Sequence, residues 1–391
     1  MNIAVNTRFL LKDKLEGIGW FTFETLKRIT HGHPEHQFYF LFDRTFPDEF
    51  IFSGNITPLI LHPQARHPVL FYLWFEHAVP KALKKVSADL FISTDGFLSL
   101  KTNVRTLLVI HDIAFEHFPD TVGKMMGWYL RKYSPQYARK AERIATVSEF
   151  SKRDIVATYG IAPEKIDVVY NGIRENCIKP PTGSAHGVFQ KFGLTHPYFL
   201  YAGAIQPRKN IVNLLRAFDE FKANARSAAQ LVIAGRKAWK FDDVMQTHQR
   251  MNFKEDVKFT GHLAAEDLAA LMYGALALVY VSKFEGFGIP VIEAMSCGTP
   301  VITSNVSSMP EVAGDAALLV NPDSVDEIAG AMEKIFRDAR LRKVLIAKGN
   351  VQRQKFSWDK TAEKLWASAE RIMSKEKIMT GGESVFASGS H

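Results

Sequence analysis

The sequence predicts an α/β protein with two doubly wound parallel sheets, each enclosing a core of its own. The chain of 391 residues is long enough for two such domains. Short apolar runs typical of strands alternate with segments of helical periodicity through both halves of the chain. The alternation stops between residues 171 and 194, where prolines, glycines and serines gather, and then begins again.

Composition and charge exclude several classes of protein. Hydrophobic residues make up 47% of the chain and charged residues 23%, which is typical of a globular protein and not of a disordered one. The net charge of +8 is spread over both halves, whereas a nucleic-acid-binding protein more often concentrates it, so no nucleic acid is expected. Cys177 and Cys297 lack the spacing of a zinc site. No signal peptide is recognised, and the apolar stretch Leu271–Val281 is too short for a bilayer, so a cytoplasmic, soluble or peripheral protein is expected.

The first domain is expected to span residues 1–178, followed by a linker at 179–194. Its predicted strands are Asn2–Asn6, Phe38–Phe42, Asp89–Ser93, Arg105–His111, Arg143–Ser148 and Lys165–Tyr170. The predicted helices are Gly19–Ile29, Pro68–Lys85, Gly123–Ala141 and Glu149–Tyr159, the last with Ser148 as its N-cap.

The second domain is expected to span residues 195–357. Its predicted strands are Tyr198–Gly203, Gln230–Gly235, Val257–Gly261, Ala275–Ser282 and Pro300–Thr303, with helices at Ile211–Ala223, Glu266–Gly274 and Val325–Phe336. No Gly-x-Gly-x-x-Gly fingerprint follows a strand, so a dehydrogenase is not predicted. An amphipathic helix is expected at 358–375, and residues 376–391 have no periodicity and are expected to form a mobile tail.

The stretch from Ser282 to Ser304 is the most informative part of the chain. It predicts a strand, a loop opened by Gly286 and Gly288, a short helix with Pro290 in its first turn, and another strand. Amides near Phe287 and Gly288, with the helix N-terminus, could hold an anion. Glu285 in the loop and Glu293 in the helix would be acceptors for the hydroxyls of a sugar or a ribose. The spacing of the pair is common, and taken alone it favours two solvated glutamates in an ordinary βα loop.

Three other places carry candidate site residues. Arg208 and Lys209 follow a strand and precede a helix, which suits a diphosphate clamp, although a solvated loop pair is the plain alternative. His111 and Asp112 come at the end of a buried strand, where open α/β sheets bind ligands. Gly17 and Gly19 lie between the first strand and the first helix, and would let a ligand approach the backbone closely.

The motif from Ser282 to Ser304 closely resembles the Glu-x7-Glu signature of the retaining GT-B glycosyltransferases of family 4. The resemblance implies that Glu285 contacts the donor sugar and that Glu293 holds the ribose of the nucleotide. It implies a clamp on the diphosphate for Lys209, with Arg208 beside it. Some members carry an arginine directly after the preceding glycine, where this chain has Ala204.

The same resemblance extends to the first half of the chain. His111, with Asp112, matches the family's segment at the reaction centre, and Gly17 and Gly19 match a loop over the donor phosphate. A GT-B protein has two Rossmann-like domains facing a cleft, with a final helix that crosses back to the first domain, which binds the acceptor. His111-Asp112 and the segment from Pro207 to Asn210 look most like mannosyltransferase members that build surface polysaccharides such as lipopolysaccharide.

The implied reaction is transfer of a hexose from a nucleotide-diphospho-sugar, GDP-mannose first, to a hydroxyl of a glycan or lipid-linked acceptor, with retention and without a metal or another cofactor. Two alternatives stay open: a GT-B sugar-nucleotide epimerase and a non-catalytic nucleotide-sugar-binding protein. The basic and aromatic segment Gly123–Arg143 is either core or a surface facing the acceptor or the inner face of the cell membrane.

Overall fold

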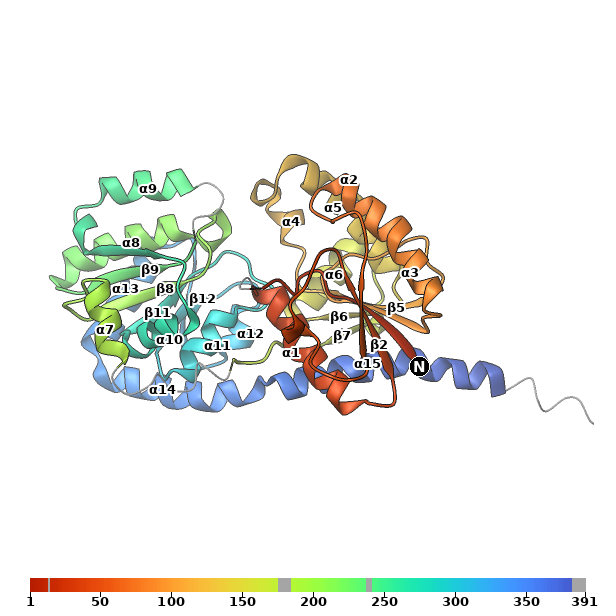
Figure 1. The fold of residues 1–391 in the computed structure, drawn as a ribbon. Coiled ribbons are helices and arrows are strands. Elements are labelled where there is room, and N and C mark those ends of the chain that lie inside the picture. The colour runs from red at the N-terminus through yellow and green to blue at the C-terminus, as the bar shows by residue number, and fades with distance from the viewer. Residues whose placement is uncertain (13–14, 175–183, 237–240, 382–391) are drawn as a thin grey trace, which may run out of the picture. The chain divides into compact units, whose positions relative to one another are not determined.

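The chain folds into two compact units, which Figure 1 shows as ribbons. The computed structural model describes residues 1–12, 15–174, 184–236 and 241–381. Unit 1 comprises Met1–Gly172 and the C-terminal segment from Ser357, and unit 2 comprises Ile173–Phe356. The sequence analysis placed the first boundary at residue 178, which lies outside the described residues, as does Cys177. Within the predicted linker, Ser184–Lys191 forms helix α7.

Unit 1 contains a parallel sheet of seven strands in the order β3-β2-β1-β4-β5-β6-β7. The strands are β1 (Asn2–Asn6), β2 (Gln37–Phe42), β3 (Ile56–Ile60), β4 (Leu90–Ser93), β5 (Arg105–Ile110), β6 (Arg143–Thr146) and β7 (Ile166–Val168). Only β3 was absent from the sequence analysis. It contains Pro58, which cannot donate to a neighbouring strand, and β3 tolerates this residue because it lies at the edge of the sheet.

Helices cover this sheet at the places that the periodicity predicted, with one addition. They are α1 (Gly17–Gly32), α2 (Pro68–Leu73), α3 (Val79–Lys85), α4 (Ala114–His117), α5 (Lys124–Lys140) and α6 (Glu149–Tyr159). The addition is α4, a short helix that the sequence analysis did not contain. The single helix predicted at Pro68–Lys85 is interrupted by a π-helical turn at Trp74–Ala78. Pro80 accounts for that turn, because a proline has no amide hydrogen for the carbonyl one turn earlier. Ser148 caps α6, as predicted, by accepting a hydrogen bond from the Ser151 amide.

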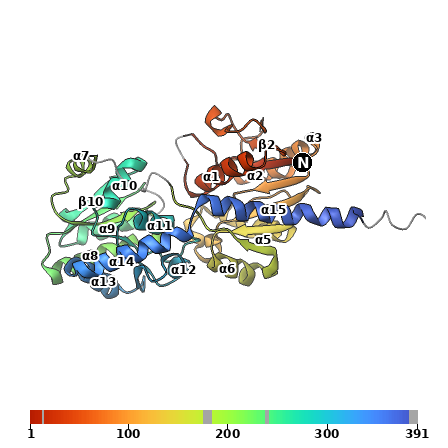
Figure 2. The same cartoon turned by 90° about the horizontal axis from the view of Figure 1, so that it is seen from below.

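The last helix, α15 (Trp358–Gly381), returns to unit 1, which confirms the predicted crossover. It packs against α1, β5 and β6, and Figure 2 shows it running beside α1. Thr361 Oγ1 donates to the Tyr170 carbonyl at 2.6 Å, and Arg105 Nη1 donates to the Ile372 carbonyl at 2.6 Å. Residues 376–381, predicted to belong to a mobile tail, are helical; residues 382–391 lie outside the described part.

Unit 2 contains a parallel sheet of six strands in the order β10-β9-β8-β11-β12-β13. The strands are β8 (Tyr198–Ala202), β9 (Gln230–Ala234), β10 (Val257–Gly261), β11 (Ala277–Tyr280), β12 (Val301–Ser304) and β13 (Ala317–Val320). Its helices after α7 are α8 (Ile211–Ala225), α9 (Phe241–Arg250), α10 (Ala265–Gly274), α11 (Ile289–Ser296), α12 (Met309–Ala313), α13 (Val325–Arg337) and α14 (Ala339–Gln352). The sequence analysis missed β13, α9, α12 and α14.

Each sheet reverses its winding at one place, and this place positions the site residues. In unit 1 the chain moves outward in one direction from β1 and in the other from β4, and these two strands are paired. In unit 2 the neighbouring strands β8 and β11 have the same relation. Loops at the carboxyl ends of such strands diverge, which leaves room for a ligand. Within the described residues, no helix is both long and apolar enough to cross a membrane.

Candidate functional site

At the reversal point of unit 2, two cations meet one carboxylate. Lys209 ends a 3₁₀ turn, Pro207–Lys209, after β8, and Glu285 lies in the loop after β11. Lys209 Nζ forms an ion pair with Glu285 Oε1 and donates to Tyr280 Oη at 2.6 Å. Arg208 Nη1 donates to Glu285 Oε2 at 3.0 Å and to the Phe284 carbonyl at 2.9 Å. The structure therefore brings Arg208, Lys209 and Glu285 together, which the sequence could suggest but not measure.

The protonation of this cluster is set by its burial and by the two cations. Glu285 is 6% exposed and Lys209 is 8% exposed. Burial alone would raise the pKa of Glu285, but the charges of Lys209 and Arg208 outweigh it and hold the pKa at about 2. Burial and the charge of Glu285 raise the pKa of Tyr280 well above its usual value, so its phenol stays neutral. The cluster carries one negative and two positive charges, and its net charge of about +1 would attract an anion.

Hydrogen bonds to the backbone fix the loops that carry these side chains. Asn210 adopts a left-handed conformation with φ of 63° at the start of α8, and its Nδ2 donates to the Val281 carbonyl at 3.0 Å and the Pro322 carbonyl at 2.6 Å. Ser308 Oγ donates to the Glu285 carbonyl at 2.9 Å and the Phe287 carbonyl at 3.0 Å. The site is therefore held in place before any ligand binds, which lowers the reorganisation needed for binding or catalysis.

Helix α11 begins immediately after this loop, as the glycine and proline pattern predicted. Gly288 has a φ of 98°, a left-handed conformation that favours glycine, and a Cβ added there would also displace the end of the Met309 side chain, whose Cε would lie 2.3 Å away. Gly286 and Phe287 lie between Glu285 and Gly288 in the same loop. The loop therefore leads directly into the N-terminus of α11, a helix of eight residues, where the helix dipole is positive.

Glu293 lies in α11 and is 3% exposed. Its Oε1 accepts a hydrogen bond from Arg174 Nε at 2.8 Å, and Arg174 Nη2 donates to the same oxygen. Within the described part of the chain, Glu293 Oε2 has no hydrogen-bond partner. The sequence analysis missed Arg174, since nothing local connects two residues that are 119 positions apart. Arg174 therefore holds one of the two carboxylate oxygens of Glu293.

His111 and Asp112 lie in unit 1, directly after β5. His111 Nε2 bonds to the Thr94 carbonyl at 2.9 Å, so that nitrogen carries the proton. Its ring meets the Phe21 ring edge-on, with centroids 4.9 Å apart, and burial lowers the pKa of His111. Asp112 Oδ1 accepts from the Ala114 amide at 3.0 Å, which is the contact of a residue that stabilises a turn.

Gly17 and Gly19 also lie in unit 1, but they do not form the loop that the sequence analysis described. The helix begins at Gly17, so both glycines belong to the first turn of α1. A Cβ on Gly19 would lie 2.9 Å from the Phe9 carbonyl oxygen and 3.0 Å from Leu15 Cδ2. Close packing of the preceding chain against the helix therefore explains Gly19. The predicted site residues thus fall into two groups: four in unit 1 and the others in unit 2.

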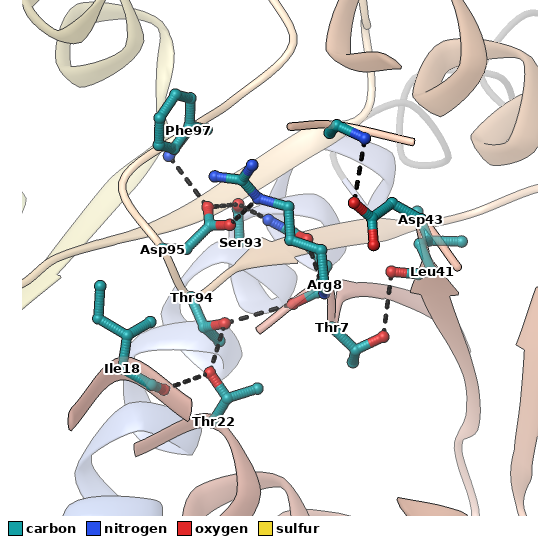
Figure 3. A network of polar contacts seen from close by, with 12 residues as sticks. Thr7, Arg8, Ile18, Thr22, Leu41, Asp43, Ser93, Thr94, Asp95 and Phe97 are labelled. Atoms are coloured by element: carbon teal, nitrogen blue, oxygen red, sulfur yellow. Dashed lines mark hydrogen bonds and ion pairs between the residues drawn. The ribbon is translucent and has the colours of Figure 1, made fainter. Parts of the chain in front are cut away.

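A polar network at the reversal point of unit 1 was not predicted. Figure 3 shows Arg8, which follows β1, facing Asp95, which follows β4. Arg8 Nε and Asp95 Oδ2 are 2.5 Å apart, with side chains 5% and 1% exposed. Thr94 Oγ1 donates to the Asn6 carbonyl at 3.3 Å and receives a hydrogen bond from Thr22 Oγ1 at 2.8 Å. Arg8 follows the end of β1 and Asp95 follows the end of β4, but only the order of the strands in the sheet shows that these two ends are neighbours.

Comparison with known proteins identifies the family. The family model "Glycosyl transferases group 1" matches residues 188–352, and "Glycosyltransferase Family 4" matches residues 24–176. The O-antigen chain mannosyltransferase RfbU of Salmonella typhimurium is 30% identical over 270 residues, which are 68% of this chain and 71% of that protein. The chain belongs to the family 4 glycosyltransferases. O-antigen chain mannosyltransferase B of Escherichia coli is 29% identical over 360 residues, covering 89% of this chain and 94% of that protein.

Solved structures show that this glycosyltransferase has the GT-B fold. Anabaena HepE, solved in complex with UDP and glucose, superposes with a TM-score of 0.73 at 19% identity, covering 96% of this chain and all of that one. WaaG, a glycosyltransferase involved in lipopolysaccharide biosynthesis, gives a TM-score of 0.73 at 16% identity, with 94% and 98% covered. The predicted fold class, two doubly wound parallel sheets with a helix that crosses back, is confirmed.

Proposed function

We propose that this glycosyltransferase transfers mannose from a nucleotide-diphospho-sugar, GDP-mannose first, to a hydroxyl of a glycan or lipid-linked saccharide, with retention and in the synthesis of a surface polysaccharide. The observation that carries the proposal is the pairing of Lys209 and Arg208 with Glu285 at the reversal point of unit 2. The mannose and the polysaccharide come from the relatives, which are O-antigen chain mannosyltransferases.

The arrangement suits the departure of a nucleoside diphosphate. Negative charge grows on the leaving diphosphate as the bond to the sugar breaks, and preorganised cations stabilise that charge without moving. Lys209 Nζ and the Arg208 guanidinium are held by Glu285, and the positive end of α11 follows in the same loop. These groups can supply the electrostatic stabilisation that a divalent cation supplies in other enzymes, so a metal-independent reaction is proposed.

The two glutamates would serve different parts of the donor. Glu285 would orient the sugar, as the family resemblance implies. It also forms ion pairs with Arg208 and Lys209 and so fixes their positions. Glu293, with one oxygen occupied by Arg174, would accept hydrogen bonds from the ribose with the other. His111, kept neutral by burial, has its Nε2 proton on the Thr94 carbonyl, so Nδ1 is the acceptor that it could offer near the reacting sugar.

Product analysis tests the proposal against its alternatives. The purified protein is incubated with GDP-mannose, with and without a mannoside acceptor, and the products are analysed by mass spectrometry. A disaccharide that forms only with acceptor supports the transferase. A sugar released or epimerised without acceptor would support the epimerase, and binding without turnover would support a binding protein. NMR of the new linkage reports retention, and equal rates with EDTA and with Mg²⁺ are expected for a metal-independent reaction.

One surface of unit 1 supports a peripheral contact with the membrane. In α5 the large apolar and aromatic side chains divide into two groups: Tyr129 and Tyr137 are buried, whereas Met125 is 50% exposed and Trp128 is 55% exposed. The Lys132 ammonium lies 4.8 Å from the Trp128 ring. Exposed apolar groups beside lysines suit an anionic lipid surface. The protein should sediment with phosphatidylglycerol vesicles and not with phosphatidylcholine vesicles, and Trp128→Ser should weaken the association.

A further inference from the structure

We propose that Arg8 binds hydroxyl groups of the acceptor sugar through its two terminal nitrogens, and that Asp95 positions it. The inference deepens the proposed function and rests on it. Arg8 and Asp95 follow β1 and β4, the two paired strands at which the sheet of unit 1 reverses. This is the place in an open parallel sheet where ligands bind, and no role in this reaction has been assigned to either residue above.

The guanidinium of Arg8 is buried but only partly satisfied. Nε pairs with Asp95, and the side chain is 5% exposed. Figure 3 shows the guanidinium of Arg8 bonded to Asp95 through Nε, and among the described residues neither Nη1 nor Nη2 has a hydrogen-bond partner. Within the same part of the chain, the fully buried side-chain atoms that lack a hydrogen-bond partner do not include Nη1 or Nη2 of Arg8, so these two nitrogens reach accessible space. Their N–H groups can therefore donate to acceptor atoms of a ligand.

Aromatic rings hold this guanidinium in position. Arg8 Cζ lies 4.4 Å from the ring centroid of Phe97, 4.8 Å from that of Phe71, 5.0 Å from that of Phe9 and 5.3 Å from that of Phe75. Such contacts stabilise a cation and restrict its rotation. A donor that cannot rotate loses little entropy when a ligand binds, which favours specific recognition.

The charge balance selects a neutral ligand over an anion. Asp95 already neutralises Arg8, and its other oxygen accepts hydrogen bonds from Ser93 Oγ at 3.3 Å and the Phe97 amide at 3.2 Å. An anion at Nη1 and Nη2 would therefore lie close to a fixed carboxylate and against an apolar wall. Sugar hydroxyls accept hydrogen bonds without adding charge, and the carbon face of a sugar ring packs well on phenylalanine.

The position of this group relative to His111 fits the acceptor. Thr94, which precedes Asp95, accepts the hydrogen bond from His111 Nε2. The negative charge of Asp95 is also near enough to raise the pKa of His111, although burial lowers it more. Arg8 therefore lies on the same edge of the sheet as the residue that the family resemblance places at the reacting sugar. A hydroxyl-bearing sugar held by Arg8 would lie in unit 1 near that residue, as an acceptor must.

Ligand binding by two variants tests the proposal. Arg8→Lys keeps a charge for Asp95 but removes the two terminal nitrogens, and Arg8→Met also removes the charge. The control is Lys27→Met, which changes an exposed cation that contacts Phe23 in the same unit. Saturation-transfer NMR measures binding of methyl α-D-mannopyranoside in the presence of saturating GDP. Calorimetry measures GDP itself, and inorganic pyrophosphate serves as an anionic probe.

Wild type and Lys27→Met should bind the mannoside alike, and Arg8→Lys should bind it at least about tenfold more weakly. All three should bind GDP with the same affinity, which shows that the donor site of unit 2 is intact. A urea midpoint close to that of wild type shows that unit 1 of Arg8→Lys is folded. Mannoside binding that survives in Arg8→Lys, or that is absent from wild type, would overturn the proposal. So would pyrophosphate that binds in the presence of GDP and is lost in Arg8→Lys, because Arg8 would then hold an anion. If wild type fails to bind GDP while mannoside binding depends on Arg8, the proposed donor fails and the Arg8 site stands.

Discussion

The reversal points of the two sheets follow the same plan but differ in charge and lining. In unit 1 a cation after β1 meets a carboxylate after β4, and in unit 2 two cations after β8 meet a carboxylate after β11. The first pair is electrically neutral and is surrounded by phenylalanines. The second cluster has an excess positive charge, and the ring beside it is Tyr280, whose hydroxyl joins the hydrogen bonds.

This difference shows how one topology can serve two ligands. The parallel sheet supplies two diverging loops, and the residues that follow the strands then decide the charge of the ligand. An excess of positive charge suits a diphosphate, whereas a balanced pair with apolar walls suits an uncharged sugar. The comparison leads to four predictions, which begin with the largest expected effect.

Removing the Lys209 ammonium should have the largest effect on catalysis. Lys209→Met should lower kcat by about 10²–10³-fold and change the affinity for the donor less, because the charge on the leaving group grows toward the transition state. The matched control is Lys283→Met. Lys283 lies in the loop after β11, and its ion-pair partner is Asp323. Steady-state kinetics measures both variants. A near-normal kcat for Lys209→Met would contradict the assignment of the clamp to unit 2.

Removing the carboxylate of unit 1 should make its reversal point resemble that of unit 2. In Asp95→Asn, Arg8 keeps its aromatic contacts but loses the charge that balances it. The variant should lose about 3 kcal/mol of unfolding free energy, as buried ion pairs do when one partner is removed. It should also gain affinity for inorganic pyrophosphate. Urea denaturation and calorimetry measure the two effects, and an Asp95→Asn variant with unchanged anion binding would show that charge balance does not select the ligand there.

Within unit 2, the two glutamates should respond differently to removal of their charge. Glu293→Gln should raise KM for the donor by about tenfold with little change in kcat, because ribose contacts are similar in the ground and transition states. Glu285→Gln should lower kcat and change binding of the bare nucleoside diphosphate little. Titration of GDP and GDP-mannose against both variants measures this. Weaker GDP binding in Glu285→Gln, with normal binding in Glu293→Gln, would reverse the assigned roles.

The sequence predicted the site of unit 2 better than that of unit 1 for a physical reason. Glu285, Gly288, Pro290 and Glu293 lie in one continuous stretch, so turn and helix rules placed them without knowledge of the rest of the chain. Arg8 and Asp95 are 87 residues apart, and only the strand order makes them neighbours. Their joint function was therefore not visible in the sequence.

The misassigned elements likewise depend on contacts between distant parts of the chain. Strand β3 was missed because Pro58 argues against a strand unless the strand is known to be at an edge. Gly17 and Gly19 were assigned to a loop that a ligand could approach, whereas the helix begins at Gly17 and Gly19 permits close packing of the preceding chain against its first turn. Arg174 was missed because its partner, Glu293, lies 119 residues away. In each case the deciding information is the position of another part of the chain.

The smallest expected effect concerns pH, and it should distinguish the two reversal points. Burial lowers the pKa of His111, so the folded protein binds this proton less readily than the unfolded chain. The contribution of His111 to the unfolding free energy should therefore be constant above about pH 6.5 and should fall as the pH drops below that value. The slope from one such group cannot exceed about 1.4 kcal/mol per pH unit.

Glu285 should not change the unfolding free energy between pH 8 and 5. Its folded pKa of about 2 lies below the unfolded value, so its stabilising contribution is complete above about pH 4.3 and is lost only as the pH falls toward 2. Urea denaturation of wild type and His111→Gln between pH 8 and 5 separates the two, since glutamine can keep a donor for the Thr94 carbonyl. The wild type should lose more stability than the variant on acidification. If the unfolding free energies of the two proteins fall in parallel on acidification, burial of the His111 imidazole does not cause the loss of stability. Another histidine would then have to cause it.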